Sequence, residues 1–363
     1  MLNLCHKIQT TDHNPVFMSY KITLNCRRFS LFTAGLLFCL PIFAQSNFDA
    51  VDQLLKQNQK AIGGGYAVVV WKDGKVVYQK SLNTDFTAKT QAPIGRAGDW
   101  MTAALVMTFV DEGKLSLDDK VTQYIPLFGK YMKGYITIRN CLTNTSGIKT
   151  DESVEKPMAK VHFETLEDMA GSYADKHSIA TNPGTEVFYS AYGPNIAGRC
   201  LEVVSKKTFG RLMMDRIERP LKMHATSFVN EDGGADDPAN GGRSCANDYI
   251  NFLTMLLNKG MFDGKRVLSE KAVQELERVQ FGNLPIKYMP KELQGAKPAL
   301  GNYLANASGT LMVSPDLQGM AAWVDTCRNY AAVIIVEKPQ EEKKPIYQNL
   351  INLVGEAIGG ACQ

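Results

Sequence analysis

Residues 98–114 read Gly-Asp-Trp-Met-Thr-Ala-Ala-Leu-Val-Met-Thr-Phe-Val-Asp-Glu-Gly-Lys, and the rest of the fold is organised around this stretch. Between Trp100 and Val110 nearly every residue is apolar, and the polar face of a surface helix is missing. We therefore predict a helix that is buried on all sides. Asp111-Glu112-Gly113 follows it, with Gly113 as the C-terminal cap. Such a helix needs apolar elements around it, and the flanking sequence contains them.

Strands are predicted on both sides of this helix in the sequence. Residues 67–71 form an unbroken apolar run, typical of a strand covered on both faces, and Lys72-Asp73-Gly74 turns it into a hairpin with residues 75–79. Further strands are predicted at residues 299–305, 310–314, 320–324 and 330–337. Helices are predicted at residues 48–61, 191–205, 209–219, 247–259 and 346–358.

Strands from both ends of the chain can share one sheet, because the terminal helices can pack on it while the middle of the chain packs elsewhere. The expected fold class is mixed α/β: an antiparallel sheet sandwiched by terminal helices, with an inserted all-helical lobe. We expect residues 46–363 to form this domain. Its sheet lobe would take in about 46–95 and 297–363, and its helical lobe about 96–296.

Residues 1–45 are predicted to be a secretory signal peptide. Arg27 and Arg28 precede a short apolar run at residues 29–44, which Pro41 interrupts, so the run is a poor membrane span. Met18 is a candidate for the true start. Export, to the periplasm or outside the cell, places the domain in an oxidising compartment. Five of the eight cysteines lie after the leader, and this odd number leaves a monomer with at least one free thiol.

Composition excludes several classes of protein. The chain has 363 residues, 45% of them apolar and 21% charged, which is a globular balance. After residue 45 there are 36 basic and 36 acidic residues, so overall charge gives no argument for nucleic acid or for an anionic membrane as a partner. No Cys-x-x-Cys pair and no histidine pair at ligand spacing is present, so neither a metal nor a cofactor is expected. No membrane span is expected once the leader is removed.

Short motifs follow one another in a fixed order from residue 101 to residue 325. They are Met101–Leu105, Val110–Asp119, Ile136–Arg139, Leu142-Thr143, Thr145-Ser146-Gly147, Pro183-Gly184-Thr185, Arg219-Pro220-Leu221, Gly241-Gly242, Asp248-Tyr249, Leu256–Gly260 and Trp323-Val324-Asp325. This series resembles the penicillin-recognising serine hydrolases, which include class C β-lactamases, D-alanyl-D-alanine carboxypeptidases and related esterases. The resemblance covers roughly residues 48–358 and implies the serine β-lactamase fold.

The resemblance also shows where the chemistry of that family should lie, and the first of its three catalytic motifs is altered. Ser-x-x-Lys stands at the head of the buried helix, where one helical turn lets the lysine amine take the serine proton. The aligned residues here are Arg96-Ala97-Gly98-Asp99. Residues 90–102 contain neither serine nor lysine, so no shift of the alignment restores the motif.

The other two motifs depart as well. Tyr-x-Asn aligns with Tyr189-Ser190-Ala191, which keeps the phenol and loses the amide. Lys-Thr-Gly, or its variants in relatives, aligns with Ser314-Pro315-Asp316, where a charged residue replaces the glycine that lets substrate approach. Asn140 and Asn144 stand where relatives often carry histidines. The resemblance therefore implies a retained scaffold without its catalytic machinery.

Each of these residues also has a simpler interpretation. Asp99 can be the N-cap of the buried helix, where a carboxylate accepts backbone N–H groups. Arg96 can pair with Asp99, or it can hold an anionic ligand. Tyr189 can be a buried residue with a satisfied hydroxyl or a working base. Residues 153–156 also spell Ser-x-x-Lys, but in a polar stretch before Pro157, which we interpret as coincidence.

Three hypotheses follow. The leading one is an exported, catalytically inactive pseudo-serine-hydrolase that binds a ligand in its cleft near Arg96, Tyr189, Ser190 and Ser314; the resemblance suggests a cell-wall peptide or peptidoglycan fragment. The second is an active esterase, amidase or peptidase with relocated residues, such as Asp99 as base or nucleophile and Tyr189 as acid. The third is an assembly partner, for which a filled cleft and an exposed apolar patch would be the signs.

Overall fold

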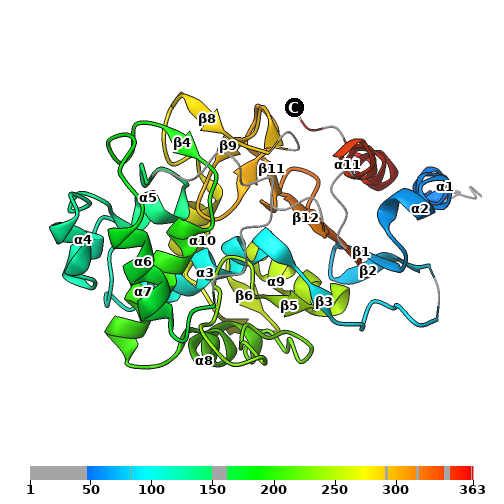
Figure 1. Cartoon of the computed structure of the whole chain (residues 1–363). Helices are drawn as coiled ribbons and strands as arrows, with labels where there is room; N and C mark the ends of the chain where they lie inside the picture. The colour runs from blue at the N-terminus through cyan, green and yellow to red at the C-terminus, as the bar shows by residue number, and fades with distance from the viewer. Residues whose placement is uncertain are drawn as a thin grey trace, which may run out of the picture. The chain divides into compact units, whose positions relative to one another are not determined.

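The computed structural model describes residues 47–82, 84–148, 162–290, 293–315, 319–338, 344–360 and 362. The predicted leader, the Ser-x-x-Lys sequence at 153–156 and Asp316 lie outside these residues. Within them the chain has the predicted fold class, a mixed α/β arrangement around an antiparallel sheet (Figure 1). No helix in the described ranges is both long and apolar enough to span a bilayer.

A seven-stranded antiparallel sheet is built from both ends of the described chain, in the order β2-β1-β13-β12-β11-β10-β9. Its strands are β1 (Tyr66–Lys72), β2 (Lys75–Ser81), β9 (Lys297–Pro298), β10 (Tyr303–Leu304), β11 (Leu311–Val313), β12 (Met320–Asp325) and β13 (Tyr330–Val336). The register pairs Tyr66 with Val336 and Lys72 with Tyr330. The three two-stranded pairs are β3 (Ala92–Pro93) with β5 (Arg243–Ser244), β4 (Val187–Phe188) with β8 (Ile286–Tyr288), and β6 (Met261–Phe262) with β7 (Lys265–Arg266).

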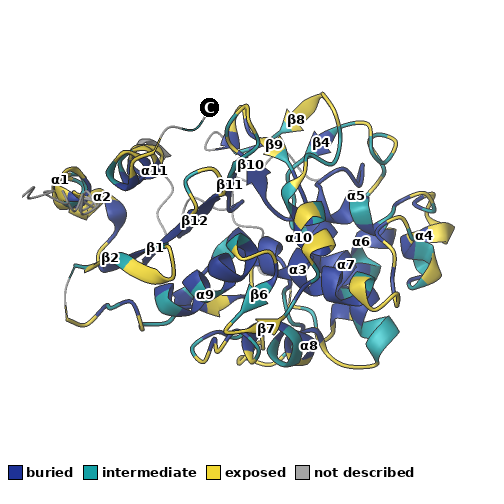
Figure 2. Ribbon diagram, turned by 180° about the vertical axis from the view of Figure 1, so that it is seen from behind, coloured by how far each residue is buried: buried dark blue, intermediate teal, exposed yellow. Residues whose placement is uncertain are grey.

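Some helices pack on the two faces of the sheet, and the others form a helical region built from the middle of the sequence. They are α1 (Asp49–Gln57), α2 (Gln59–Ile62), α3 (Gly98–Asp111), α4 (Leu127–Lys130), α5 (Ile138–Leu142), α6 (Leu166–Asp175), α7 (Tyr192–Ser205), α8 (Phe209–Met213), α9 (Ala246–Leu257), α10 (Glu270–Glu277) and α11 (Lys344–Ile358). Short turns of helix are η1 (Gly95–Ala97), η2 (Val121–Gln123) and the π-helix η3 (Met214–Glu218). Figures 1 and 2 show α1, α2 and α11 together beside β1 and β2, with α9 on the opposite side.

Alternation along β1 explains why its apolar run is continuous. Tyr66, Val68 and Val70 belong to the core beneath α1 and α11, whereas Ala67 and Val69 belong to the core that contains α3 and α9. Successive side chains of a strand point to opposite faces, so a strand with helices on both sides needs apolar residues at every position. The prediction of a strand covered on both faces is confirmed.

Three predicted elements differ in the structure, and one of them is the helix predicted at 209–219, which divides into α8 and the π-helix η3. The helix predicted at 48–61 is interrupted at Asn58, between α1 and α2. The strand predicted at 299–305 reduces to β10, because Gly301 adopts a left-handed backbone (φ 68°) and its N–H donates to the Leu142 carbonyl. That turn brings the β10 segment against α5, and it interrupts the extended conformation that the apolar run predicts.

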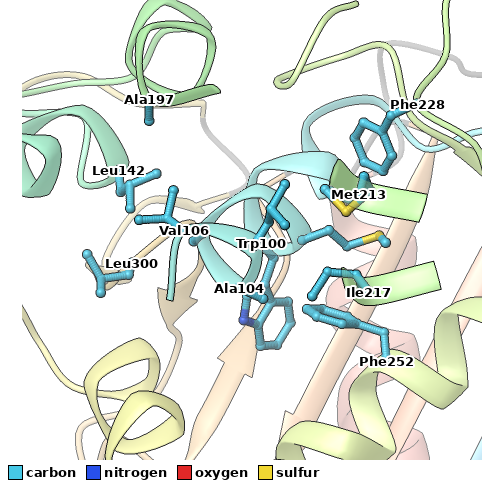
Figure 3. Packing of buried hydrophobic residues seen from close by; sticks show 14 of the residues in the cluster. Trp100, Ala104, Val106, Leu142, Ala197, Met213, Ile217, Phe228, Phe252 and Leu300 are labelled. Carbon is cyan, nitrogen blue, oxygen red and sulfur yellow. The ribbon is translucent and has the colours of Figure 1, made fainter. Parts of the chain in front are cut away.

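The helix predicted from the opening stretch is α3, and it is buried along its length. Residues 98–109 are all buried, and Figure 3 shows side chains of the surrounding elements converging on it. Trp100 packs edge-to-face on Phe252 of α9, with ring centroids 6.0 Å apart. The predicted terminator is also present, since Gly113 has a φ of 65°. The α3 helix is thus covered by α9 on one side and by helices of the middle region on the other.

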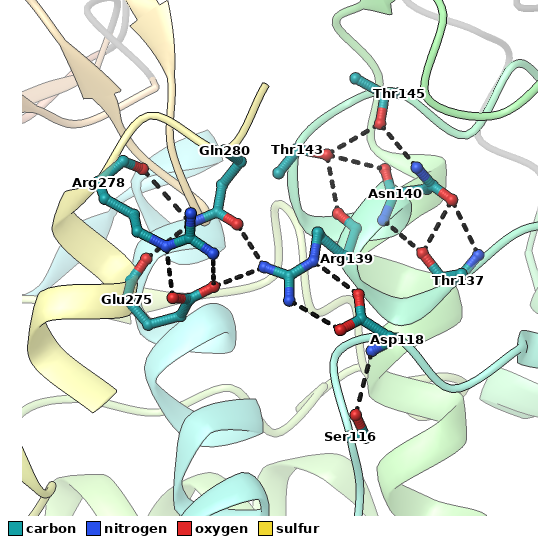
Figure 4. A network of polar contacts seen from close by, with 10 residues as sticks. All are labelled: Ser116, Asp118, Thr137, Arg139, Asn140, Thr143, Thr145, Glu275, Arg278 and Gln280. Carbon is teal, nitrogen blue, oxygen red and sulfur yellow. Dashed lines mark hydrogen bonds and ion pairs between the residues drawn. The ribbon is translucent and has the colours of Figure 1, made fainter. Parts of the chain in front are cut away.

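A polar network connects α5 to α10 and shows what one of the resemblance motifs does structurally (Figure 4). Arg139 pairs with Asp118 through Nε at 2.8 Å and with Glu275 through Nη1 at 2.5 Å. Beside it, Thr137 and Asn140 form a reciprocal capping box at the start of α5. Arg139 therefore joins two helices and the loop before η2, a role in packing rather than in chemistry.

The cysteines after the leader divide into one disulfide and three thiols. Cys327, in the turn between β12 and β13, is bonded to Cys362. Cys141, Cys200 and Cys245 are unbonded and buried. The disulfide attaches the segment after α11 to the sheet hairpin.

Close contact between α5 and α7 generates the first prediction. A Cβ placed on Gly193 of α7 would lie 1.9 Å from the Cys141 carbonyl oxygen of α5. Gly193→Ala must force the two helices apart, and we expect it to lower the free energy of unfolding by about 1–3 kcal/mol or more. Urea denaturation monitored by circular dichroism measures the effect.

Gly171 of α6 provides the matched control, because a Cβ there would meet only the Leu127 side chain at 3.6 Å. Gly171→Ala should be neutral or stabilise by up to about 1 kcal/mol, since alanine is the better helix former. Equal losses in the two variants would contradict the close contact as the cause.

Candidate functional site

Arg96 and Asp99, which align with the catalytic serine and lysine, face each other at the N-terminal end of α3. Arg96 lies in η1 and Asp99 in the first turn of α3, three residues apart, which places both on one side of the helix. The Arg96 Nε donates to the Asp99 Oδ2 at 2.9 Å, and its Nη2 donates to the same oxygen. The Asp99 side chain is 1% exposed and that of Arg96 10%. The two positions that the family resemblance assigns to nucleophile and base thus hold a buried ion pair.

The structure corrects one interpretation of Asp99 and settles one of Arg96. The N-cap of α3 is Ala97, without a side-chain cap hydrogen bond, so the interpretation of Asp99 as N-cap is wrong. The helix begins earlier than Trp100 because η1 leads directly into it. Arg96 does pair with Asp99, but within the protein interior and not on the surface.

Tyr189 and Ser190 join this pair from the segment before α7. The Arg96 Nη2 donates to the Ser190 carbonyl oxygen at 2.8 Å, and its guanidinium carbon lies 4.3 Å from the centre of the Tyr189 ring. The Tyr189 hydroxyl donates to the Pro315 carbonyl oxygen at 3.2 Å. Tyr189 is half-buried, and the cation–π contact covers one face of its ring. Three of the sequence-predicted site residues therefore form one contact group with Asp99.

Asn144 and Tyr303 support the same group from the other side. The Ser190 N–H donates to the Asn144 Oδ1 at 3.0 Å, and the Asn144 Nδ2 donates to the Tyr303 hydroxyl at 3.1 Å. Asn144 has a left-handed backbone (φ 57°), which asparagine tolerates well. Burial raises the pKa of Tyr303 above its ordinary value. The sequence marks Asn144 only as a position where relatives often carry a histidine. No sequence signal points to Tyr303, because the contact of its hydroxyl with Asn144 depends on where β10 packs.

Ser314 lies nearby but is used in the sheet. It is fully buried, its N–H donates to the Ala322 carbonyl at 2.8 Å, and its Oγ accepts from the Ala322 N–H at 3.1 Å. The next residue, Pro315, accepts the Tyr189 hydroxyl. The end of β11 is thus beside the contact group, while the Ser314 hydroxyl holds β11 to β12.

The electrostatics of the group oppose acid–base chemistry at Arg96. Burial alone lowers the pKa of the guanidinium, but the charge of Asp99 and its hydrogen bond to Arg96 outweigh this and hold that pKa above its ordinary value. A guanidinium that stays protonated is neither a nucleophile nor a base. Among the described contacts, none joins the Ser190 hydroxyl to a histidine, a lysine or a carboxylate.

A carboxylate with a strongly raised pKa lies elsewhere in the described part of the chain. Glu218 ends η3, is 6% exposed, and its Oε1 has no hydrogen-bond partner among the described residues. Burial, and then the charge of Asp248, raise the pKa of Glu218 to about 8. Asp248 of α9 accepts hydrogen bonds from the Ala225 N–H and the Thr226 hydroxyl. Glu218 therefore lies beside α9, among residues that are not part of the contact group around Tyr189.

One group of three potential metal ligands lies close together in the described part of the chain. It consists of Asp325, Cys327 and Cys362. The two sulfurs are bonded to each other, so neither is a thiolate that could bind a metal. One surface hollow, of about 290 Å³, is lined by Asp85, Phe86, residues 90–93, Arg243 and Glu337. Another, of about 470 Å³, is lined by Asn47 and residues of α1 and α11. Arg96 lines neither of them.

Comparison with known proteins agrees with this architecture. A family model described as Beta-lactamase matches residues 51–355, which is most of the chain. The chain belongs to the β-lactamase family. The crystal structure of a candidate β-lactamase from Bacteroides dorei DSM 17855 superposes with a TM-score of 0.74 and 27% identity, covering 85% of this chain and 98% of that one. The structure of a family VIII carboxylesterase superposes with a TM-score of 0.68 and 17% identity, covering 85% of this chain and 97% of that one. At this identity the likeness shows a shared fold alone.

Relatives by sequence align over shorter stretches of this β-lactamase-family chain. Protein flp of Staphylococcus aureus (strain MW2) is 25% identical over 189 residues, 49% of this chain and 38% of that protein. Penicillin-binding protein 4 of Amycolatopsis lactamdurans is 28% identical over 242 residues, 56% of this chain and 62% of that protein. The chain thus spans about two fifths of the length of the Staphylococcus relatives.

The buried ion pair generates the second prediction. Arg96→Met leaves the Asp99 carboxylate buried without its cation, and we expect a loss of about 3–5 kcal/mol in the free energy of unfolding. The double variant Arg96→Met/Asp99→Leu removes both charges and should recover much of that loss, since apolar pairs often replace buried ion pairs at little cost. Urea denaturation of these two variants and of the single variant Asp99→Leu measures this. A double variant that loses the sum of the two single effects would contradict the pairing.

Glu218 generates the third prediction, on pH. Its ordinary pKa is 4.5 and its pKa in the folded protein about 8, so between these values the folded state keeps a proton that the unfolded state releases. The free energy of unfolding must therefore fall as pH rises through this window, by up to about 1.4 kcal/mol per pH unit. Glu218→Gln should flatten this part of the stability–pH curve and stabilise the protein at pH 8. Glu231→Gln, at an exposed site, is the control and should leave the curve unchanged.

Proposed function

We propose that this member of the β-lactamase family is an exported protein that does not form an acyl-enzyme and acts by binding. The observation that carries the proposal is the Arg96–Asp99 ion pair at the head of α3. Acylation by this fold needs a hydroxyl at that position and a neutral amine or another base beside it. Here a permanent cation and its counter-ion occupy both places, and Tyr189 and Ser190 are bound to the cation.

The export part of the proposal rests on the leader sequence and on cysteine pairing. A basic pair followed by a short apolar run precedes the domain. The Cys327–Cys362 disulfide supports export, because disulfides persist in oxidising compartments and are rare in reducing ones.

The binding part rests on what remains around the ion pair. Arg96 is committed to Asp99 and Ser190, so we do not assign it the role of holding an anionic ligand. The half-buried edge formed by Tyr189 and Ser190 is the remaining polar and aromatic surface of the group. A cell-wall peptide is the ligand we propose for it, since relatives of this chain include a protein named Penicillin-binding protein 4.

Intact-mass spectrometry tests the proposal and is the fourth prediction. After incubation with a labelled penicillin and, separately, with a fluorophosphonate probe, we expect the purified protein to keep its unmodified mass. A penicillin-binding protein treated in parallel with the penicillin, and a serine esterase treated with the fluorophosphonate, must each show the stable adduct and so validate the two probes.

A stoichiometric adduct on the native chain would overturn the proposal in favour of an active hydrolase with relocated residues. The variant Ser190→Ala then locates the nucleophile, because it removes the one serine hydroxyl of the Tyr189-Ser190-Ala191 segment without touching the ion pair. Loss of the adduct in this variant would place the nucleophile at Ser190, and its persistence would place it elsewhere.

A further inference from the structure

The loop after α4 exposes apolar side chains that soluble proteins normally bury. Met132 is 87% exposed, Tyr135 76% and Tyr131 42%. These are three of the six large apolar side chains that are exposed in the described ranges, and they lie within five consecutive residues. We call residues 130–135 the aromatic loop. The other three lie singly on other segments, at Val76, Val229 and Ile286.

A buried lysine holds the aromatic loop in this conformation. Lys133 is 2% exposed, and its Nζ donates to the Ala174 carbonyl of α6 at 2.5 Å and to the Tyr131 carbonyl at 3.4 Å. Lysine is among the residues least often buried, and methionine among those most often buried, so the loop inverts the usual arrangement. Burial lowers the pKa of Lys133, which is a cost of this arrangement. Met132 also has a left-handed backbone (φ 61°).

Positive charge surrounds the exposed side chains. The chain contains no acidic residue from position 120 to position 150. Lys120 and Lys130 are exposed, and the Lys120 Nζ lies 5.4 Å from the centre of the Tyr135 ring. Asp175 of α6 acts on the buried Lys133 ammonium, and Asp118 and Asp119 directly precede Lys120 in the sequence. The loop therefore presents an apolar tip with lysines at its border, although the domain as a whole has no net charge.

The size and charge of this surface select among occupants. Its three side chains expose on the order of 400 Å², about half of what each partner buries in a stable protein complex. A second copy packed on the same loop would also bring two sets of lysines together. A bilayer with negatively charged headgroups does not require a large protein interface, and it attracts the lysines instead of repelling them. Tyrosine is suited to the interface, methionine can enter its apolar edge, and each lysine near such a surface adds about 1 kcal/mol.

We propose that the aromatic loop docks this protein onto an anionic lipid bilayer, with Tyr131, Met132 and Tyr135 at the acyl–headgroup boundary and Lys120 and Lys130 on lipid phosphates. The proposal is independent of the site around Arg96. Figures 1 and 2 show α4 and its neighbouring loop at the edge of the helical region, away from the sheet.

Vesicle co-sedimentation of the protein without its leader tests the proposal and is the fifth prediction. We expect binding to vesicles of phosphatidylglycerol and phosphatidylcholine in equal parts, weakening as salt is raised, and little binding to phosphatidylcholine alone. Met132→Glu/Tyr135→Glu should lower the partition coefficient at least about tenfold. Lys120→Glu/Lys130→Glu should abolish the preference for the anionic vesicles.

Val229→Glu/Ile286→Glu is the matched control, since it removes two exposed apolar side chains and adds the same charge elsewhere. It should bind like the native protein. Three outcomes would overturn the proposal: no binding to anionic vesicles, an equal loss in the control, or binding that ignores lipid charge. A concentration-dependent dimer in solution that Met132→Glu/Tyr135→Glu abolishes would overturn it in favour of a self-association surface.

Discussion

The antiparallel pairing of β1 with β13 is the constraint on which the rest of this structure depends. It joins segments from opposite ends of the described chain over seven residue pairs, and both strands are covered on their two faces. Everything between them is therefore an insertion whose ends are held together. The contacts that this pairing requires are long-range, and their entropic cost is offset by burial on both sides of the sheet. This pairing places β11–β13 in the same sheet as β1, and so it brings the end of β11 close to the N-terminal end of α3.

The Arg96–Asp99 pair shows how a catalytic position can be refilled without loss of the fold. A buried ion pair adds little net stability, yet either charge without the other is costly there. The two positions are thus coupled, and a change at one favours a compensating change at the other. Asn144 and Tyr303 complete the hydrogen bonds around the group, so the chain retains an ordered polar site inside the protein. A site that holds charges in this way resembles an active site in polarity.

Particular residues show how far the sequence predicts this site. The three-residue spacing of Arg96 and Asp99 predicts a pair on one helix face, and alignment with relatives brings Tyr189 and Ser190 to the same region. Burial of the pair is not predictable in the same way, because it depends on elements that pack over the head of α3. The interpretation of Asp99 as an N-cap is wrong for this reason. Tyr303 was missed because it enters the site only through the turn at Gly301, which shortened the predicted strand.

Periodicity and turn residues in the sequence determined most of the elements: a strand apolar at every position, a helix apolar all round, and the glycine that ends it. These signals are local, since they depend on neighbours two to four residues apart. Tertiary structure alone decided which of five cysteines pair, that the Ser314 hydroxyl serves the sheet, and that Lys133 points inward while Met132 points outward. Each of these depends on atoms far away in the sequence, such as the Ala174 carbonyl that accepts the Lys133 ammonium. A local pattern carries no information about such partners, because they meet only after the chain has folded.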